Sequence, residues 1–283
     1  MHALSKAKTS RHRVKATIKA AGEIRVGIGG WVFKPWRDNF YPQGLVQKRE
    51  LEYASRHVTA IEVNGTFYGA QKPPTYARWR EETPDGFVFS AKAPQRITMS
   101  RTLSKTGGAI ADFLEGIATL GDKLGPIVWQ FEKPQIDRED FAAFLALLPK
   151  EVAGLQIRHV LDMRNAEFVD AHYLELARKH GMATVFTDST EHPSFADITA
   201  DFVYARLMRS RAAIATGYPD DEVDQWHDRA RAWARGDDPA DLPHIAALRP
   251  GSGRRDVFVF FISSAKERNP AAAMALLGRL GAN

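Results

Sequence analysis

Eight short apolar segments recur along the sequence, and most of the stretches between them have the apolar spacing of a helix. Short strands that alternate with helices are typical of a parallel β-sheet. Eight such units in 283 residues predict a single-domain α/β protein, a closed (β/α)8 barrel of the TIM type, which typically needs about 250 residues. The predicted strands are Ile24–Gly29, Ala60–Val63, Phe87–Lys92, Ile127–Gln130, Gln156–Asp162, Ala183–Asp188, Phe202–Leu207 and Asp256–Ile262.

The stretches between these segments predict the helices. Pro73 and Pro270 suit the first turn of a helix, and Gly181 suits the position just after its end. The expected helices cover residues 47–56, 73–82, 109–120, 138–148, 166–180 and 222–235, with a last one starting at Pro270. The connection 190–200 shows no convincing helix. An open doubly wound sheet is the alternative, which the absence of a G-x-G-x-x-G motif in the first loop disfavours.

Positive charge is concentrated at the N-terminus. Residues 1–25 contain seven lysines and arginines and one glutamate, although the formal charge of the whole chain is only +5. We predict a basic, solvated and disordered tail at residues 1–22, followed by one barrel domain at 23–283. A contact between this tail and nucleic acid is the alternative interpretation.

The composition excludes several classes of protein. The chain has no cysteine, so it contains no disulfide framework, thiol nucleophile or thiolate metal site. No apolar run approaches the ~20 residues that a membrane-spanning helix needs, and the N-terminal segment lacks the apolar core of a secretory signal. We therefore expect a cytoplasmic protein without a membrane partner.

The C-terminal ends of the barrel strands are the expected location of a functional site. Glu62 would lie on a buried strand, where a carboxylate is costly unless it is partnered or functional. Alternation along the strand places Asn64 on the same face, and the two-residue spacing aligns Asp162 with Arg164. The candidate residues at the strand ends are Glu62, Asn64, Lys92, Gln130, Asp162, Arg164, Asp188 and Arg206, with Trp31, Trp36, Phe67 and Tyr68 as the expected aromatic wall.

The chemistry of these side chains suggests roles. Glu62 is the predicted general base, with Asp162 and Asp188 as orienting groups or a second acid. Lys92 could be an electrophile, a point charge for an oxyanion, or a Schiff-base amine if its pKa is lowered. The planar guanidinium groups of Arg164 and Arg206 suit phosphate or carboxylate. The expected ligand is therefore a small anion, phosphorylated or sugar-like.

No metal site is predicted. Alternation places His159 on the opposite face from Asp162, toward the helices, and no histidine-based metal motif occurs. No cofactor is evident, and a magnesium ion bound by Glu62, Asp162 and Asp188 stays open as an alternative.

Three segments, residues 24–31, 39–42 and 61–68, together with Phe87–Pro94 and Arg206–Leu207, resemble the YecE-like family, domain of unknown function 72. The resemblance covers roughly residues 23–281. It implies a TIM-type barrel whose mouth contains the matching Glu62, Lys92, Gln130, Arg164, Asp188 and Arg206. It implies no particular reaction.

The chain departs from the family pattern at three places. It has Asp162-Met163-Arg164-Asn165 where the family usually has Glu-Phe-Arg-His, Arg206-Leu207-Met208-Arg209 where the family usually has Arg-Leu-His-Gly, and Ile262-Ser263 in place of paired asparagines. A histidine-dependent step is therefore not expected here. The reaction stays open between sugar-isomerase-like and phosphoester-processing chemistry. The rival interpretations are a protein that binds or processes nucleic acid, and a non-catalytic ligand sensor or scaffold.

Overall fold

The first and last strands of the chain pair with each other and so close the barrel. The computed structural model describes residues 21–248 and 253–281. Eight parallel strands surround the axis in the order β1, β2, β3, β4, β7, β8, β9 and β10, and β10 pairs again with β1. Their bounds are Ile24–Gly29, Ala60–Val63, Val88–Lys92, Leu124–Phe131, His159–Met163, Ala183–Thr187, Phe202–Leu207 and Asp256–Phe261. The predicted (β/α)8 barrel is confirmed.

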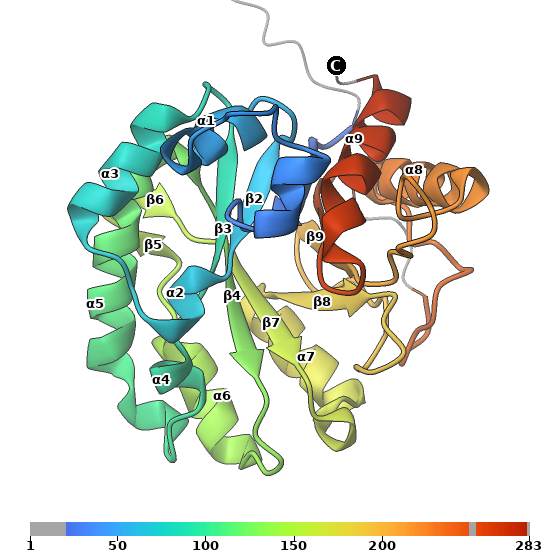
Figure 1. Ribbon diagram of the computed structural model, residues 1–283. Coiled ribbons are helices and arrows are strands. Elements are labelled where there is room, and N and C mark those ends of the chain that lie inside the picture. The colour runs from blue at the N-terminus through green and yellow to red at the C-terminus, as the bar shows by residue number, and fades with distance from the viewer. Residues whose placement is uncertain (1–20, 249–252, 282–283) are drawn as a thin grey trace, which may run out of the picture.

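Helices surround the strands on the outside (Figure 1). The longer ones are α3 (Pro73–Glu82), α5 (Gly107–Ile117), α6 (Arg138–Leu147), α7 (Ala171–His180), α8 (Asp220–Arg235) and α9 (Asn269–Leu280). Short helices α1 (Glu50–Ala54), α2 (Gly65–Tyr68) and α4 (Gln95–Thr98) lie in the connections. The connection from β8 to β9 has no helix, as expected. No helix in the described parts of the chain is long and apolar enough to span a membrane.

Two apolar layers hold the barrel together. Between strands and helices lies a large layer that includes Trp129, Phe144 and Trp233, all inaccessible to solvent. The barrel interior contains a smaller cluster with Val128, Tyr204 and Phe260. Because side chains alternate along each strand, apolar residues fill the interior near the N-terminal ends while polar ones follow toward the C-terminal ends.

The structure differs from the predicted elements mainly around the fifth strand. The predicted strand Gln156–Asp162 is divided, because β5 (Glu151–Val152) and β6 (Leu155–Gln156) form a separate hairpin before β7. Its turn, Ala153-Gly154, has positive φ at both residues, 50° and 78°, as a two-residue hairpin turn of type I′ requires.

The helix expected at 166–180 is also divided. Its first part is a 3-10 turn, and the side chain of Asp170 accepts a hydrogen bond from the Tyr173 amide at the start of α7. Gly181 ends α7 in the left-handed conformation, as predicted. The predicted tail at 1–22 lies outside the described residues except for positions 21 and 22.

Candidate functional site

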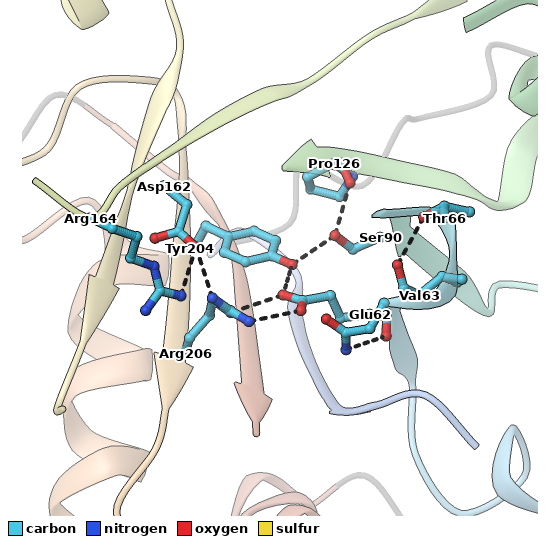
Figure 2. A network of polar contacts seen from close by, with 10 residues as sticks. Glu62, Val63, Thr66, Ser90, Pro126, Asp162, Arg164, Tyr204 and Arg206 are labelled. Atoms are coloured by element: carbon cyan, nitrogen blue, oxygen red, sulfur yellow. Dashed lines mark hydrogen bonds and ion pairs between the residues drawn. The ribbon is translucent and has the colours of Figure 1, made fainter. Parts of the chain in front are cut away.

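Five interior-facing side chains at the C-terminal ends of β2, β3, β4, β7 and β9 form a buried polar cluster in the barrel mouth: Glu62, Lys92, Gln130, Asp162 and Arg206. Parallel pairing sets Gln130 beside Asp162, and the stagger of the strands brings β9 across to β2. Arg164, one residue beyond the end of β7, joins the cluster through Asp162 (Figure 2).

Arg206 connects the two carboxylates. Its Nη1 donates to Asp162 Oδ2 at 2.8 Å and its Nη2 donates to Glu62 Oε1 at 3.1 Å. Its Nε lies 3.1 Å from Glu62 Oε2. Burial lowers the pKa of Arg206, but Glu62 and Asp162 outweigh burial, so that the pKa is raised. Arg206 is therefore a permanent buried cation held between two anions.

Both oxygens of Glu62 are occupied. Besides Arg206, the hydroxyl of Tyr204 donates to Glu62 Oε2 at 2.8 Å and also lies 2.7 Å from Ser90 Oγ. Ser90 Oγ in turn reaches the carbonyl oxygen of Pro126 at 2.8 Å. Burial, followed by Glu62, raises the pKa of Tyr204 well above its usual value. A carboxylate held in this way is suited to orienting Arg206, and less to accepting a proton from a ligand.

Asp162 is bonded on one side only. Its Oδ2 accepts from Arg164 Nη2 and from Arg206 Nη1, each at 2.8 Å. Burial raises the pKa of Asp162, but the two guanidinium groups outweigh it, so that the pKa is lowered. Among the described residues, Oδ1 of Asp162 has no hydrogen-bond partner, whereas the other three carboxylate oxygens of the pair are engaged.

Lys92 is the unengaged cation of the cluster. Its residue is 8% exposed, its Nζ lies 5.4 Å from the centre of the Phe67 ring, and it forms no hydrogen bond or ion pair through Nζ within the part of the chain that the structure describes. Burial chiefly, and then Arg206, lowers the pKa of Lys92 to about 8, against the opposing effect of Glu62 and Asp162.

Three further polar atoms of the mouth are buried without a hydrogen-bond partner in the described residues: Gln130 Oε1, Arg164 Nε and Arg206 Nε, the last of which lies against Glu62 as an ion pair only. The amide nitrogen of Gln130 donates to Glu132. Buried polar atoms are nearly always satisfied in proteins. An acceptor, a donor and a free ammonium group at one mouth are therefore groups that a ligand could satisfy.

Asp188 is a predicted site residue that the structure places away from the others. Asp188 is outside the cluster: it accepts from the Met208 amide and from Tyr218 Oη, the latter at 3.0 Å, and burial raises its pKa. Ala183 and Val185 of β8 face the barrel interior, so two-residue alternation places Thr187 on that face as well. Asp188, the next residue, therefore points away from the interior. Its contacts fix the loop after β9.

Only one of the predicted aromatic residues lies against the cluster. Phe67 is buried beneath Lys92, whereas Tyr68 is 80% exposed. Trp31 packs edge-on against Trp79 with ring centroids 4.9 Å apart, in the layer between strands and helices. Trp36 is fully buried in that same outer layer. Asn64 is half-buried and donates to the carbonyl oxygen of its neighbour Glu62.

The three carboxylates proposed for magnesium do not meet, because Arg206 lies between Glu62 and Asp162, and Asp188 lies elsewhere. No group of three or more histidine, aspartate or glutamate side chains in the described chain could hold a metal. His159 faces the helices as predicted: Trp129 Nε1 donates to its Nδ1 at 3.0 Å.

The sequence interpretation missed Tyr204. Its position two residues before Arg206 places both side chains on the inner face of β9. This two-residue spacing is the sequence feature that could have identified Tyr204 as a neighbour of the cluster. It also missed His192, in the connection after β8. Burial lowers the pKa of His192, and the charges of Arg164 and Asp162 act on it.

Comparison with known proteins places the chain among uncharacterised relatives. A family model described as "Protein of unknown function DUF72" matches residues 25–283. UPF0759 protein YecE of Escherichia coli (strain K12) is 34% identical over 139 residues, 48% of each chain. UPF0759 protein YunF of Bacillus subtilis (strain 168) is 32% identical over 75 residues, 26% of each chain. The match thus spans about half the length of YecE and less of YunF.

Solved structures share the fold. A DUF72 family protein from Thermotoga maritima superimposes with a TM-score of 0.70 at 17% identity, covering 92% of this chain and 99% of that one. One from Enterococcus faecalis gives 0.66 at 15% identity, with 93% and 99% covered. D-psicose 3-epimerase, determined in the presence of D-fructose, gives 0.54 at 11% identity, with 92% and 100% covered. At these low sequence identities the similarity to solved structures supports the fold alone, whereas the family model matches almost the whole chain. The chain therefore belongs to the DUF72 family of proteins of unknown function.

Proposed function

We propose that the mouth of the barrel binds a small anionic ligand that carries a carboxylate or phosphate group. The observation that carries the proposal is the charge balance of the buried cluster. Two carboxylates, Glu62 and Asp162, face three cations, Lys92, Arg164 and Arg206, which leaves one positive charge in excess when Lys92 is protonated. A buried charge is costly unless it is paired, and a ligand anion would supply the missing partner.

The unequal pairing of the three cations with protein carboxylates also favours a ligand. All three guanidinium nitrogens of Arg206 lie against protein carboxylates, whereas among the described residues Arg164 Nε has no hydrogen-bond partner and Lys92 Nζ has neither a hydrogen bond nor an ion pair. An anion seated between Arg164 and Lys92 would satisfy both. In this arrangement Glu62 orients Arg206, and Lys92 takes the place of Glu62 as the group available for chemistry.

A thermal-shift experiment with inorganic phosphate, lactate and glycerol phosphate tests the proposal. A ligand at about 100 times its dissociation constant stabilises the folded state by about 2.7 kcal/mol, which raises the Tm of a domain of this size by roughly 5 °C. Arg164→Met should abolish the shift.

Arg158→Met is the matched control. Arg158 precedes β7 at the opposite end of the barrel, where it pairs with Asp256 at 2.7 Å. The substitution Arg158→Met removes one positive charge, as Arg164→Met does, but leaves the mouth unchanged. The ligand-induced rise in its Tm should therefore equal that of the wild type. Equal shifts in all three proteins would place the anion elsewhere and refute the proposal.

A further inference from the structure

We propose that the Nζ amine of Lys92 forms an imine with the carbonyl carbon of an anionic keto or aldehyde compound bound at the mouth. This inference rests on the proposed anion binding and specifies its chemistry. The ligand class would be a small α-keto acid or keto phosphate, because the site offers both cations for the anionic group and an amine for the carbonyl.

The backbone of Lys92 is held rigidly while its amine is left free. Lys92 is the last residue of β3, and Thr66 Oγ1 donates to its carbonyl oxygen at 2.7 Å. The side chain extends past the Phe67 ring into the cluster. Arg206 occupies both oxygens of Glu62 and one of Asp162, so that these oxygens are not available to hold Lys92 as an ammonium ion. Within residues 21–248 and 253–281, the barrel thus presents an amine that no ion pair holds in its protonated form.

The surroundings of Lys92 also raise the fraction of its amine that is neutral, and only the neutral amine has an electron pair available for bonding. Burial and the charge of Arg206 lower the pKa of Lys92 to about 8. At pH 7 about one molecule in ten then carries the neutral amine, against fewer than about one in a thousand for an ordinary lysine. A desolvated lysine near a second cation is a recognised form of activated amine nucleophile.

The reaction balances without an oxidant or reductant. The nitrogen electron pair forms the C–N bond while the π electrons of the carbonyl move to oxygen, which takes up a proton that the nitrogen loses. The C–O bond of this carbinolamine then breaks as the electron pair of nitrogen forms the C=N bond, and the oxygen leaves as water with a second proton, the one that the nitrogen gives up in this step. Asp162 Oδ1, the carboxylate oxygen without a partner among the described residues, can carry these protons. Gln130 Oε1 can accept from the carbinolamine hydroxyl.

Reductive trapping tests the proposal directly. The full chain is incubated separately with pyruvate, glyoxylate and dihydroxyacetone phosphate in the presence of sodium cyanoborohydride, and the modified lysines are mapped by mass spectrometry of peptides. With at least one probe we expect Lys92 to be modified at least tenfold faster than the exposed Lys48 and Lys72. Lys92→Arg keeps the charge but forms no imine, and Lys92→Met is a second variant of similar bulk. Both should leave only the slow surface labelling.

Lactate separates this inference from the proposed function, because it has the carboxylate of pyruvate without the carbonyl. If lactate raises the Tm of the wild type and of Lys92→Arg while Lys92 is labelled no faster than Lys48 by any probe, the imine is refuted and anion binding stands. If no anion raises the Tm and Lys92 is not labelled selectively, both proposals fail. Selective labelling of Lys92 without stabilisation by any anion would refute the dependence of imine formation on the anion site.

Discussion

Replacing Arg206 by methionine should destabilise the protein more than any other single charge removal at the mouth. Arg206 is 2% exposed and is the shared partner of Glu62 and Asp162. Removing one partner of a buried ion pair typically costs 3–5 kcal/mol. Here Glu62 loses its cationic partner and Asp162 loses one of its two, so we expect the upper half of that range, about 4–5 kcal/mol. At roughly 2 °C per kcal/mol for a domain of this size, the Tm should fall by about 8–10 °C.

Urea unfolding followed by tryptophan fluorescence measures this change, and pH supplies a second test. In the wild type the lowered pKa of Asp162 gives a contribution to stability that is present above the unfolded pKa and is lost as the pH falls through the folded pKa. Without Arg206, one of the cations that lower the pKa of Asp162 is lost, so that the folded pKa of Asp162 is higher in the variant than in the wild type. The deficit of the variant should therefore be largest at neutral pH and should shrink as the pH falls through the folded pKa of Asp162 in the variant.

Arg158→Met again serves as the control, since that pair is partly exposed and exposed pairs contribute about 0–1 kcal/mol. The double variant Glu62→Gln/Arg206→Met should recover part of the loss, because one uncompensated carboxylate is then removed. An Arg206→Met deficit no larger than that of Arg158→Met, or one that does not change with pH, would refute the reasoning.

Three further predictions concern Lys92, His159 and Gly27. Lys92→Met should raise the free energy of unfolding at pH 7 by up to about 3 kcal/mol, since each pKa unit is worth about 1.4 kcal/mol and the folded pKa is lowered to about 8. The gain should shrink between pH 8 and 10.5, where the unfolded chain holds more protons than the folded one; a gain that is constant in urea titrations at pH 7 and 9.5 would contradict the assignment. His159 should stay neutral with its proton on Nε2 down to pH 5, because burial lowers its pKa to about 4 and Pro149 offers a carbonyl at 2.8 Å. Its contribution to stability is full above the unfolded pKa and is lost as the pH falls toward 4, and imidazole NMR shifts that titrate near pH 6.5 would disprove this. Gly27→Ala should cost about 3 kcal/mol, the upper range of overpacking, because a Cβ there would lie 2.1 Å from the Ala60 carbonyl oxygen. In the control Gly65→Ala the added Cβ meets nothing within 4 Å. Differential scanning calorimetry should give this control a Tm within a few degrees of the wild type.

The fold was predictable because its signal is repeated eight times. A single apolar segment is ambiguous, but eight at barrel spacing leave few alternatives. What the pattern could not predict was local turn chemistry. The Ala153-Gly154 turn needs positive φ at an alanine, which is uncommon for residues other than glycine. The hairpin before β7 is therefore absent from the prediction, which includes only its last residue, Gln156, in the fifth strand.

The site was partly predictable for the same reason. Two-residue alternation places Glu62, Lys92, Gln130, Asp162 and Arg206 in the interior, but it also excludes Asp188, whose neighbour Thr187 faces inward. Trp31 follows Gly30, whose φ of 72° turns the chain after β1, and its ring packs outside the barrel. Which cation bridges which carboxylate depends on the stagger between strands, and no sequence period reports that stagger.

The pairing of β1 with β10 has a consequence for the synthesis of the protein on the ribosome. Residue 29 ends β1, and residue 261 ends the strand that covers its open edge. At translation rates of about 5–20 residues per second, that edge remains uncovered for roughly 10–50 s. An unpaired strand edge is a template for pairing with other chains. The nascent chain is therefore most vulnerable to aggregation before its last strand emerges, and factors that shield nascent chains should increase its yield more than they increase the stability of the finished barrel.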